Sequence, residues 1–207
     1  MIYLFDFDGT LVDSMPVWAN VQKKVLIDAG ITPSEDFLKI ITPLGGHGTA
    51  EYCGKIIGKT AEEVLEITDA VLYDKYAYEI PAKENVRETL KELKKQGHSL
   101  NVLTACPHVR LDVCLKRLGI FDIFDNVWST DDFDSPKSEP KIYHDAASRL
   151  GVNVSECMFL DDNFNAVKAA KDAGMISVGV YDDTSEEFVD EIKSVTDNYI
   201  YSFKELI

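Results

Sequence analysis

Short apolar runs alternate with helical patterns along most of this chain. The first run, Ile2–Phe5, is typical of a buried strand and is followed at once by polar residues. Later apolar runs predict strands at 100–103, 126–129, 158–160 and 176–180, with a short segment at 199–201. Helical patterns predict helices at 83–96, 107–118, 138–150, 163–173 and 185–196. This alternation predicts a parallel sheet with right-handed crossovers and helices on both faces.

Residues 15–80 break this alternation, because they show helical patterns only. The predicted helices run from about 16 to 29, from near Pro33, from 49 to 57 and from 60 to about 78. The residues expected to face inward in the last helix are Val64, Ile67, Val71 and Leu72. We therefore expect an α/β fold with a Rossmann-like core, residues 1–14 and 81–207, and an inserted all-helical lid, residues 15–80.

Two aspartates, Asp6 and Asp8, follow directly after the first predicted strand. Residues i and i+2 of an extended chain point to the same side, so both carboxylates can converge on one point. Burying two like charges together is costly unless a cation or a shared proton offsets them. The pattern indicates a metal site, a pair of acid/base carboxylates, or both.

A second acidic pair, Asp161 and Asp162, follows the predicted strand at 158–160. Adjacent carboxylates at a buried strand end favour a hard cation with oxygen ligands. Thr104 and Lys137 also fall just past predicted strands. Because ligands of parallel sheets bind beyond the carboxyl ends of the strands, we expect these side chains to gather along one edge.

Composition limits the possible partners. The 207 residues include 36 acidic and 21 basic side chains, which give a net charge of −15 and argue against nucleic acid or an anionic membrane as a partner. A phosphate substrate would need local positive charge or a metal. The four cysteines form no Cys-x-x-Cys pair and the N-terminus does not read as a signal peptide, so we expect reduced thiols in a cytoplasmic protein. No obligate protein partner is evident.

The string Asp6–Ser14 resembles the first motif of the haloacid dehalogenase superfamily, Asp-x-Asp-x-Thr after a strand. Thr104, Lys137 and the Asp161–Asp162 pair match the second, third and fourth motifs in order. Ala105 and Ser138 depart from the residues often found beside the second and third motifs. The resemblance covers essentially the whole chain and implies the helical-cap subgroup that includes phosphoglycolate phosphatases and β-phosphoglucomutases.

The resemblance also implies a chemistry, namely magnesium-dependent hydrolysis of a small phosphorylated metabolite. Asp6 would attack phosphorus and form an aspartyl phosphate, and Asp8 would act as general acid and base. Thr104 and Lys137 would bind the phosphoryl group. The implied Mg²⁺ ligands are Asp6, the Asp8 carbonyl, Asp162 and, directly or through water, Asp161. The implied substrate contacts from the lid are His47, Thr49 and Glu51.

Two other functions stay open. A phosphosugar mutase of the same fold would return the phosphoryl group to a sugar, but the mutase branch carries an arginine in the lid loop. The segment 44–52 contains no Lys or Arg, which favours hydrolysis. A phospho-receiver module would use Asp6 as a signal, but such modules have no lid and do not need Asp8 as an acid. Phosphoglycolate, a sugar phosphate and a nucleotide all remain possible substrates.

Overall fold

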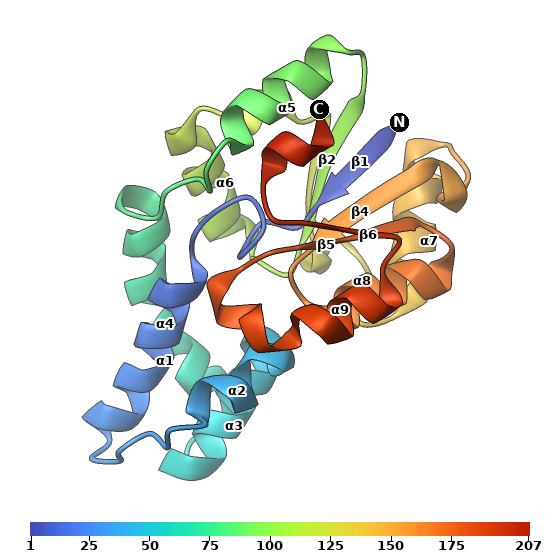
Figure 1. The fold of residues 1–207 in the computed structure, drawn as a ribbon. Helices are drawn as coiled ribbons and strands as arrows, with labels where there is room; N and C mark the ends of the chain where they lie inside the picture. The colour runs from blue at the N-terminus through green and yellow to red at the C-terminus, as the bar shows by residue number, and fades with distance from the viewer.

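The structure, a computed structural model, describes residues 1–207 apart from the side chain of Pro43. Its described backbone forms one parallel six-stranded sheet with the order β3-β2-β1-β4-β5-β6. The strands are β1 (Ile2–Phe5), β2 (Ser99–Thr104), β3 (Asn126–Ser129), β4 (Cys157–Asp161), β5 (Ile176–Val180) and β6 (Asn198–Ile200). The strand order reverses direction between β1 and β4, which lie side by side at the centre (Figure 1).

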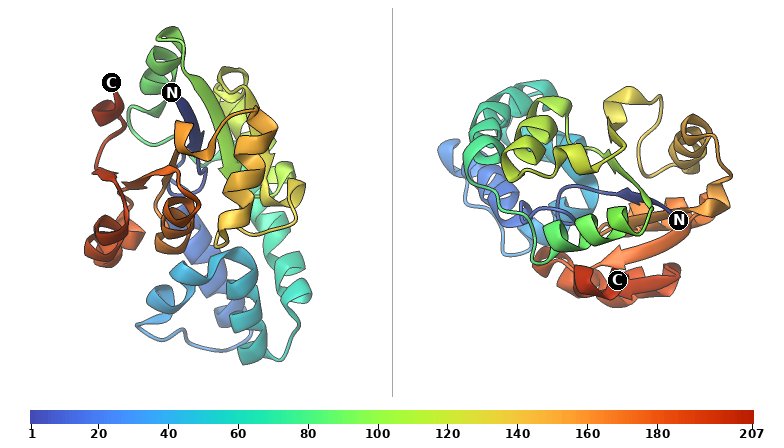
Figure 2. Two further views of the ribbon diagram at one scale, coloured as in Figure 1. Left: turned by 90° about the vertical axis from the view of Figure 1, so that its right-hand side faces the viewer. Right: turned by 90° about the horizontal axis from the view of Figure 1, so that it is seen from above.

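Helices cover both faces of the sheet, as the alternating pattern predicts (Figure 2). The core helices are α5 (Val86–Lys95), α6 (His108–Leu118), α7 (Pro140–Leu150), α8 (Phe164–Ala173) and α9 (Val189–Val195). The side chains of Tyr3 and Phe5 pack with α5 and α6, whereas Leu4 packs with α7 and α8. This alternation along β1 follows from the opposite directions of successive strand side chains.

The segment 15–80, here called the lid, is helical and contributes no strand to the sheet within the described backbone. Its elements are α1 (Met15–Asp28), α2 (Phe37–Ile41), the 3₁₀ helix η1 (Thr42–Leu44), α3 (Gly45–Ile57) and α4 (Ala61–Tyr78). They gather at the end of the molecule opposite the two termini (Figure 1). A separate apolar cluster, which includes Phe37, Ile41 and Val64, fills the space between them. That the lid is a domain of its own stays a prediction.

The lid helices differ from the expected pattern in several places. The expectation that Ile67 and Val71 face inward is wrong, because these side chains are 45% and 42% exposed. The buried stripe of α4 instead follows a spacing of four residues, through Val64, Thr68, Leu72 and Tyr76. This spacing is the natural one for a helix face, and it places a tyrosine at its end. The helix expected near Pro33 begins at Phe37, and the one expected from residue 49 begins at Gly45.

The two connections between lid and core lie against each other. Val12 and Ala82 form an antiparallel bridge, and the Asp13 amide donates to the Pro81 carbonyl over 3.0 Å. On the core side, Arg110 of α6 forms an ion pair with Asp69 of α4. Both connections and helix α4 are therefore anchored close to the carboxyl end of β1.

The cysteines and the C-terminal helix can be compared with the predictions from the sequence. The four cysteines are buried free thiols, as predicted. Near the C-terminus, the helix expected at 185–196 is divided into a 3₁₀ helix, η5 (Asp183–Phe188), and α9. Among the described residues, no helix is both long and apolar enough to cross a membrane.

His108 joins helix α6 to the short 3₁₀ helix η3 (Thr130–Asp132). Its ring nitrogens lie 3.1 Å from Asp112 Oδ1 and 2.8 Å from Asp132 Oδ2. Hydrogen bonds to Asp112 and Asp132 raise the pKa of His108 above its ordinary value. The protonated ring therefore links the two elements more strongly than the neutral ring does.

Candidate active site

Three buried carboxylates meet where the central strands β1 and β4 end. Oxygen atoms of Asp6, Asp161 and Asp162 all lie within 4.8 Å of one another. The strand pairing brings them together, because the Asp6 amide donates to the Leu160 carbonyl over 2.9 Å and so continues the β1–β4 ladder. This is the point where the strand order reverses, which is where open α/β sheets bind their ligands.

Lys137 reaches the same cluster from the loop before α7. Its Nζ donates to Asp6 Oδ1 over 2.5 Å and to Asp161 Oδ2 over 2.7 Å. Burial alone would lower the pKa of Lys137, but the charges of Asp161 and Asp6 outweigh it and raise the pKa. The Tyr143 hydroxyl donates to the Lys137 carbonyl over 2.7 Å, which fixes the loop. Lys137 is therefore a protonated side chain that forms an ion pair with Asp6, the carboxylate that follows β1.

One lysine does not balance three buried carboxylates. Burial, followed by the charge of Asp6, raises the pKa of Asp161 to about 7. Burial and the charge of Asp161 also raise the pKa of Asp162. Burial penalises uncompensated charge, and three convergent carboxylate oxygens are the hard donors that divalent cations prefer. The residues present fit a divalent metal ion at Asp6, Asp161 and Asp162.

Gly9 and Thr10 place Asp162 against the turn that follows Asp8. Gly9 has φ +75°, and a Cβ on it would lie 2.5 Å from Asp162 Oδ2. Glycine is therefore required here both by the left-handed backbone and by the close approach of the carboxylate. The Thr10 hydroxyl donates to Asp162 Oδ1 over 3.3 Å.

Asp8 differs from the three carboxylates of the cluster in its hydrogen-bond partners. Its Oδ1 accepts a hydrogen bond from the Ser14 hydroxyl over 2.6 Å and another from the Tyr76 hydroxyl over 2.5 Å. Burial raises the pKa of Asp8, although these two hydrogen bonds act in the opposite direction. Burial and the neighbouring Asp8 raise the pKa of Tyr76 well above its ordinary value, so its hydroxyl stays a donor. The two aspartates of the motif therefore have different surroundings.

Thr104 ends β2, the strand next to β1, and is fully buried. Its Oγ1 accepts a hydrogen bond from the Cys106 amide over 3.2 Å. Burial raises the pKa of the Cys106 thiol, which therefore stays protonated. Thr104 thus lies at the same edge of the sheet as Asp6, one strand away.

A second ion pair, in which Asp182 is buried and Lys83 partly buried, lies beside the cluster. Lys83, just after the second lid connection, donates to the Tyr181 carbonyl over 2.7 Å and lies 2.8 Å from Asp182 Oδ2. The negative charge of Asp182 contributes to the raised pKa of Asp162, and Lys83 opposes it. This pair joins Lys83 to a residue that follows β5. It was not anticipated from the sequence, because a lone lysine and a lone aspartate carry no motif.

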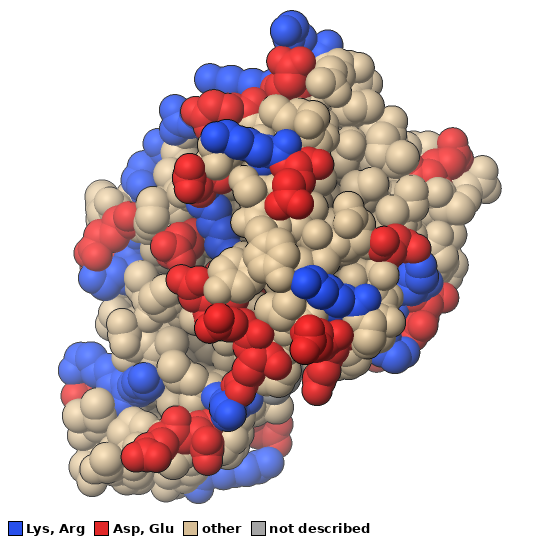
Figure 3. Space-filling view, in the orientation of Figure 1, with Lys and Arg blue, Asp and Glu red and all other residues tan. Residues whose placement is uncertain are grey.

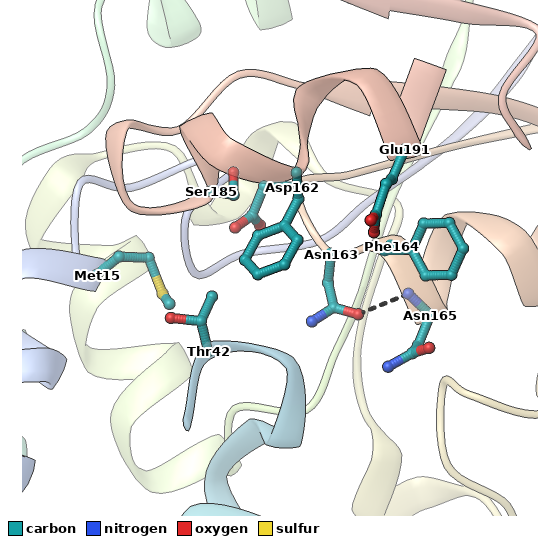
Figure 4. Close-up of a pocket in the computed structure, with 9 residues that line it drawn as sticks. Met15, Thr42, Asp162, Asn163, Phe164, Asn165, Ser185 and Glu191 are labelled. Carbon is teal, nitrogen blue, oxygen red and sulfur yellow. Dashed lines mark hydrogen bonds between the residues drawn. The ribbon is translucent and has the colours of Figure 1, made fainter. Parts of the chain in front are cut away.

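A cavity of about 120 Å³ lies between the lid and Asp162 of the three-carboxylate cluster (Figure 4). The lid contributes Met15 and Thr42, and Asp162 lies opposite them. The remaining lining residues belong to the core: Asn163, Phe164, Asn165, Ser185, Phe188 and Glu191. The segment after β5, with η5 and α9, therefore forms one wall of this space.

The lid residues expected to contact substrate do not belong to the described lining of this cavity. His47 and Glu51 are exposed on α3, and neither is among the described residues that line the cavity. Thr49 is fully buried, and its hydroxyl donates to the Ile41 carbonyl over 3.2 Å, so it packs within the lid. That these residues contact the substrate stays a prediction. They belong to helix α3, which begins at Gly45 and not at residue 49 as expected.

Acidic side chains surround the cavity on the outside. Figure 3 shows them gathered over η5 and α9, beside a hollow at the border between lid and core. Glu187 of η5 pairs with Lys39 of the lid over 2.7 Å across this border. The surface field here opposes an anionic ligand, so positive charge must come from inside the site.

The family of the chain follows from its sequence. A family model described as haloacid dehalogenase-like hydrolase matches residues 1–174. The chain belongs to this family. The pyrophosphatase PpaX of Bacillus velezensis is 32% identical over 177 residues, which are 86% of this chain and 81% of that protein. A phosphoglycolate phosphatase of Psychrobacter arcticus is 29% identical over 189 residues, with 86% and 82% of the two chains covered.

The fold of this haloacid dehalogenase-like hydrolase agrees with solved structures. Rhodobacter sphaeroides CbbY, crystallised in complex with xylulose-(1,5)bisphosphate, superposes with a TM-score of 0.82 at 20% identity. The match covers 99% of this chain and 95% of that one. This similarity confirms the expected α/β architecture of the family.

Proposed function

We propose that this haloacid dehalogenase-like hydrolase is a magnesium-dependent phosphatase that cleaves a small phosphomonoester through an aspartyl phosphate on Asp6. The observation that carries the proposal is the contrast between its two motif aspartates. Asp6 is held by Lys137 beside two further carboxylates, whereas Asp8 accepts hydrogen bonds from two hydroxyl groups. A nucleophile and a general acid need opposite protonation states, and these surroundings separate them.

In the first step, a carboxylate oxygen of Asp6 attacks phosphorus while the ester oxygen leaves with its bonding electron pair. Lys137 offsets the negative charge that accumulates between Asp6 and the phosphoryl group. Thr104, at the neighbouring strand end, is positioned to donate to a phosphoryl oxygen. Asp8 donates its proton to the leaving oxygen, so the product alcohol departs neutral.

In the second step, water cleaves the aspartyl phosphate. Asp8, now ionised, takes a proton from that water, whose oxygen attacks phosphorus and releases the Asp6 carboxylate. Mg²⁺ would be held by Asp6, Asp162, the Asp8 carbonyl and, directly or through water, Asp161, and would supply charge neutralisation for the phosphoryl oxygens. Nothing in this scheme requires a second cofactor.

The leaving group would occupy the cavity under the lid. Its volume of about 120 Å³ suits a small phosphorylated metabolite. Met15 and Thr42 from the lid, with Phe188 and Glu191 from the core, would contact the part of the substrate that differs between phosphate esters. His47 and Glu51 could reach the substrate only if the lid moved. We place the reaction in the cytoplasm, in keeping with four free thiols.

Phosphate release from a panel of small phosphate esters, and from pyrophosphate, tests this proposal. We expect turnover with Mg²⁺ and its loss after exhaustive chelation, because the buried carboxylates repel a phosphate dianion without a cation. Turnover that survives chelation would contradict the metal role. Isomerisation of a sugar phosphate without phosphate release would instead identify a phosphosugar mutase.

Substitutions of the two aspartates test the covalent route. Asp6→Asn should abolish turnover because the amide is not a nucleophile. Asp8→Asn should lower turnover of an alkyl phosphate by about 100- to 10,000-fold, the usual contribution of a general acid/base. Acid quenching should trap a phosphoenzyme in Asp8→Asn. The double variant Asp6→Asn/Asp8→Asn should trap none. Near-normal turnover by Asp6→Asn would refute the covalent intermediate.

A further inference from the structure

A tyrosine of lid helix α4 is hydrogen-bonded to the candidate acid/base. Tyr76, near the end of α4, is 2% exposed and lies among apolar groups of the core. Its hydroxyl donates to Asp8 Oδ1 over 2.5 Å. The donor and acceptor are 68 positions apart in the sequence, so the fold and not a local turn creates this contact.

The tyrosine ring is held firmly in place. It stacks on Phe7, with ring centroids 5.9 Å apart and an interplanar angle of 28°. The Arg110 guanidinium lies 5.9 Å from the ring centroid, and Arg110 is itself paired with Asp69 of the same lid helix. Arg117 donates to the Tyr76 carbonyl over 3.1 Å. The hydroxyl therefore points at Asp8 from a fixed ring.

The two hydrogen bonds to Asp8 end on the same oxygen. Ser14 donates to Oδ1 over 2.6 Å, and Tyr76 donates to that same atom. An oxygen that accepts two O–H donors has its lone pairs occupied, because a carboxyl oxygen has two such sites. As long as both hydroxyls donate to Oδ1, the proton of neutral Asp8 is on Oδ2.

We propose that Tyr76 is a positioning residue that reserves Oδ1 of Asp8 as an acceptor and so presents Oδ2 to the leaving oxygen of the substrate. This inference rests on the proposed phosphatase function. In the step concerned, the Oδ2–H bond breaks and an O–H bond forms on the leaving oxygen as the P–O bond breaks. Tyr76 keeps its own proton throughout.

The position of the two donors links this geometry to the lid. Ser14 immediately precedes α1 at the first connection, and Tyr76 lies four residues before Ile80 at the second. A lid movement that shifts either connection changes the hydrogen bonds on Asp8. The structure thus gives the lid a direct contact with the residue that protonates the leaving group.

The test is the dependence of rate on the leaving group in Tyr76→Phe. Phenylalanine keeps the ring and its stacking on Phe7 but removes the donor. Tyr78→Phe is the matched control, because Tyr78 belongs to the same helix and is 74% exposed. The measurement is kcat/KM with Mg²⁺ for aryl phosphates of decreasing leaving-group acidity and for an alkyl phosphate, with the melting temperature of each variant recorded.

We expect the loss in Tyr76→Phe to grow as the leaving group becomes poorer, to about tenfold for the alkyl ester, the upper end of the usual net contribution of one hydrogen bond. The loss should be smallest for 4-nitrophenyl phosphate, which needs no acid. In an Asp8→Asn background the substitution should add no further leaving-group dependence, because the group it positions is then absent.

Two outcomes would overturn the inference. An equal loss with every leaving group would mean that Tyr76 only supports the fold, and no loss would mean that its hydrogen bond has no part in the reaction. Either result, with an active wild-type enzyme, leaves the phosphatase proposal intact. A wild-type protein that releases phosphate from none of these esters would instead refute the phosphatase proposal itself.

Discussion

Gly9→Ala is the most informative single substitution, because the structure separates its two effects. The first effect is backbone strain at φ +75°, which costs an L residue about 1–2 kcal/mol. The second is overlap with Asp162, since the new Cβ would lie 2.5 Å from Oδ2. Ordinary contact begins near 3.5 Å, so the carboxylate would have to move by about 1 Å.

Gly151→Ala is the matched control for backbone strain. Gly151 has φ +70°, but a Cβ there would meet no atom within 4 Å. Both variants should lose about 1–2 kcal/mol of folding free energy. For a chain of this size, 1 kcal/mol corresponds to roughly 2–4 °C in melting temperature. Gly151→Ala should therefore melt a few degrees below the wild type, and Gly9→Ala at that temperature or lower, because Asp162 must also move.

Activity should distinguish the two variants. A misplacement of about 1 Å in a catalytic constellation can cost roughly 100-fold in rate, so Gly9→Ala should lose about that much and require more Mg²⁺ for half-maximal activity. Gly151→Ala should keep its rate below its melting temperature. The assay is phosphate release against Mg²⁺ concentration. Equal activity in both variants would refute the reasoning that Gly9 makes room for Asp162.

Further predictions concern the cavity wall and His108. Phe188→Ala and Thr42→Ala should change the relative kcat/KM values among natural phosphate esters more than the value for a small generic ester. Glu66→Gln, an exposed position of α4 outside the cavity, should leave those ratios as they are. Equal scaling of all substrates would contradict the assignment of the wall. His108→Gln should lower the melting temperature more at pH 6 than at pH 9. The pKa of His108 is raised in the folded protein. Its contribution to the free energy of unfolding is therefore complete below the unfolded pKa near 6.5 and is lost as pH rises through the folded pKa. An equal drop in melting temperature at both pH values would exclude this linkage.

Much of the architecture is encoded locally. Alternating apolar runs and helical patterns predicted the parallel sheet, because strand burial and helix periodicity are properties of neighbouring residues. The same holds for the acidic pairs at strand ends. Once β1 and β4 were placed in one parallel sheet, Asp6 and Asp162 had to share an edge, and the structure brings them within reach of one ion.

The sequence pattern predicted the buried faces and the first residues of the lid helices less accurately than it predicted the sheet. Val71 and Leu72 are adjacent, so both could not face the same core, and the four-residue spacing from Val64 leads to Tyr76. That spacing was available in the sequence and would have marked Tyr76 as buried. The sequence did not show which residue the Tyr76 hydroxyl contacts, because the contact with Asp8 depends on how α4 packs against the core.

Tertiary structure alone decided which polar residues meet across long separations. The pairing of Lys83 with Asp182 and of Tyr76 with Asp8, and the cavity wall formed by Thr42 and Phe188, join segments far apart in the chain. No local propensity encodes such contacts, because they arise when the lid and the elements after β5 pack over the same sheet edge. The sequence by itself determined the sheet and the acidic centre of the site, and the packing of the lid determined the surroundings of Asp8 and the space left for a substrate.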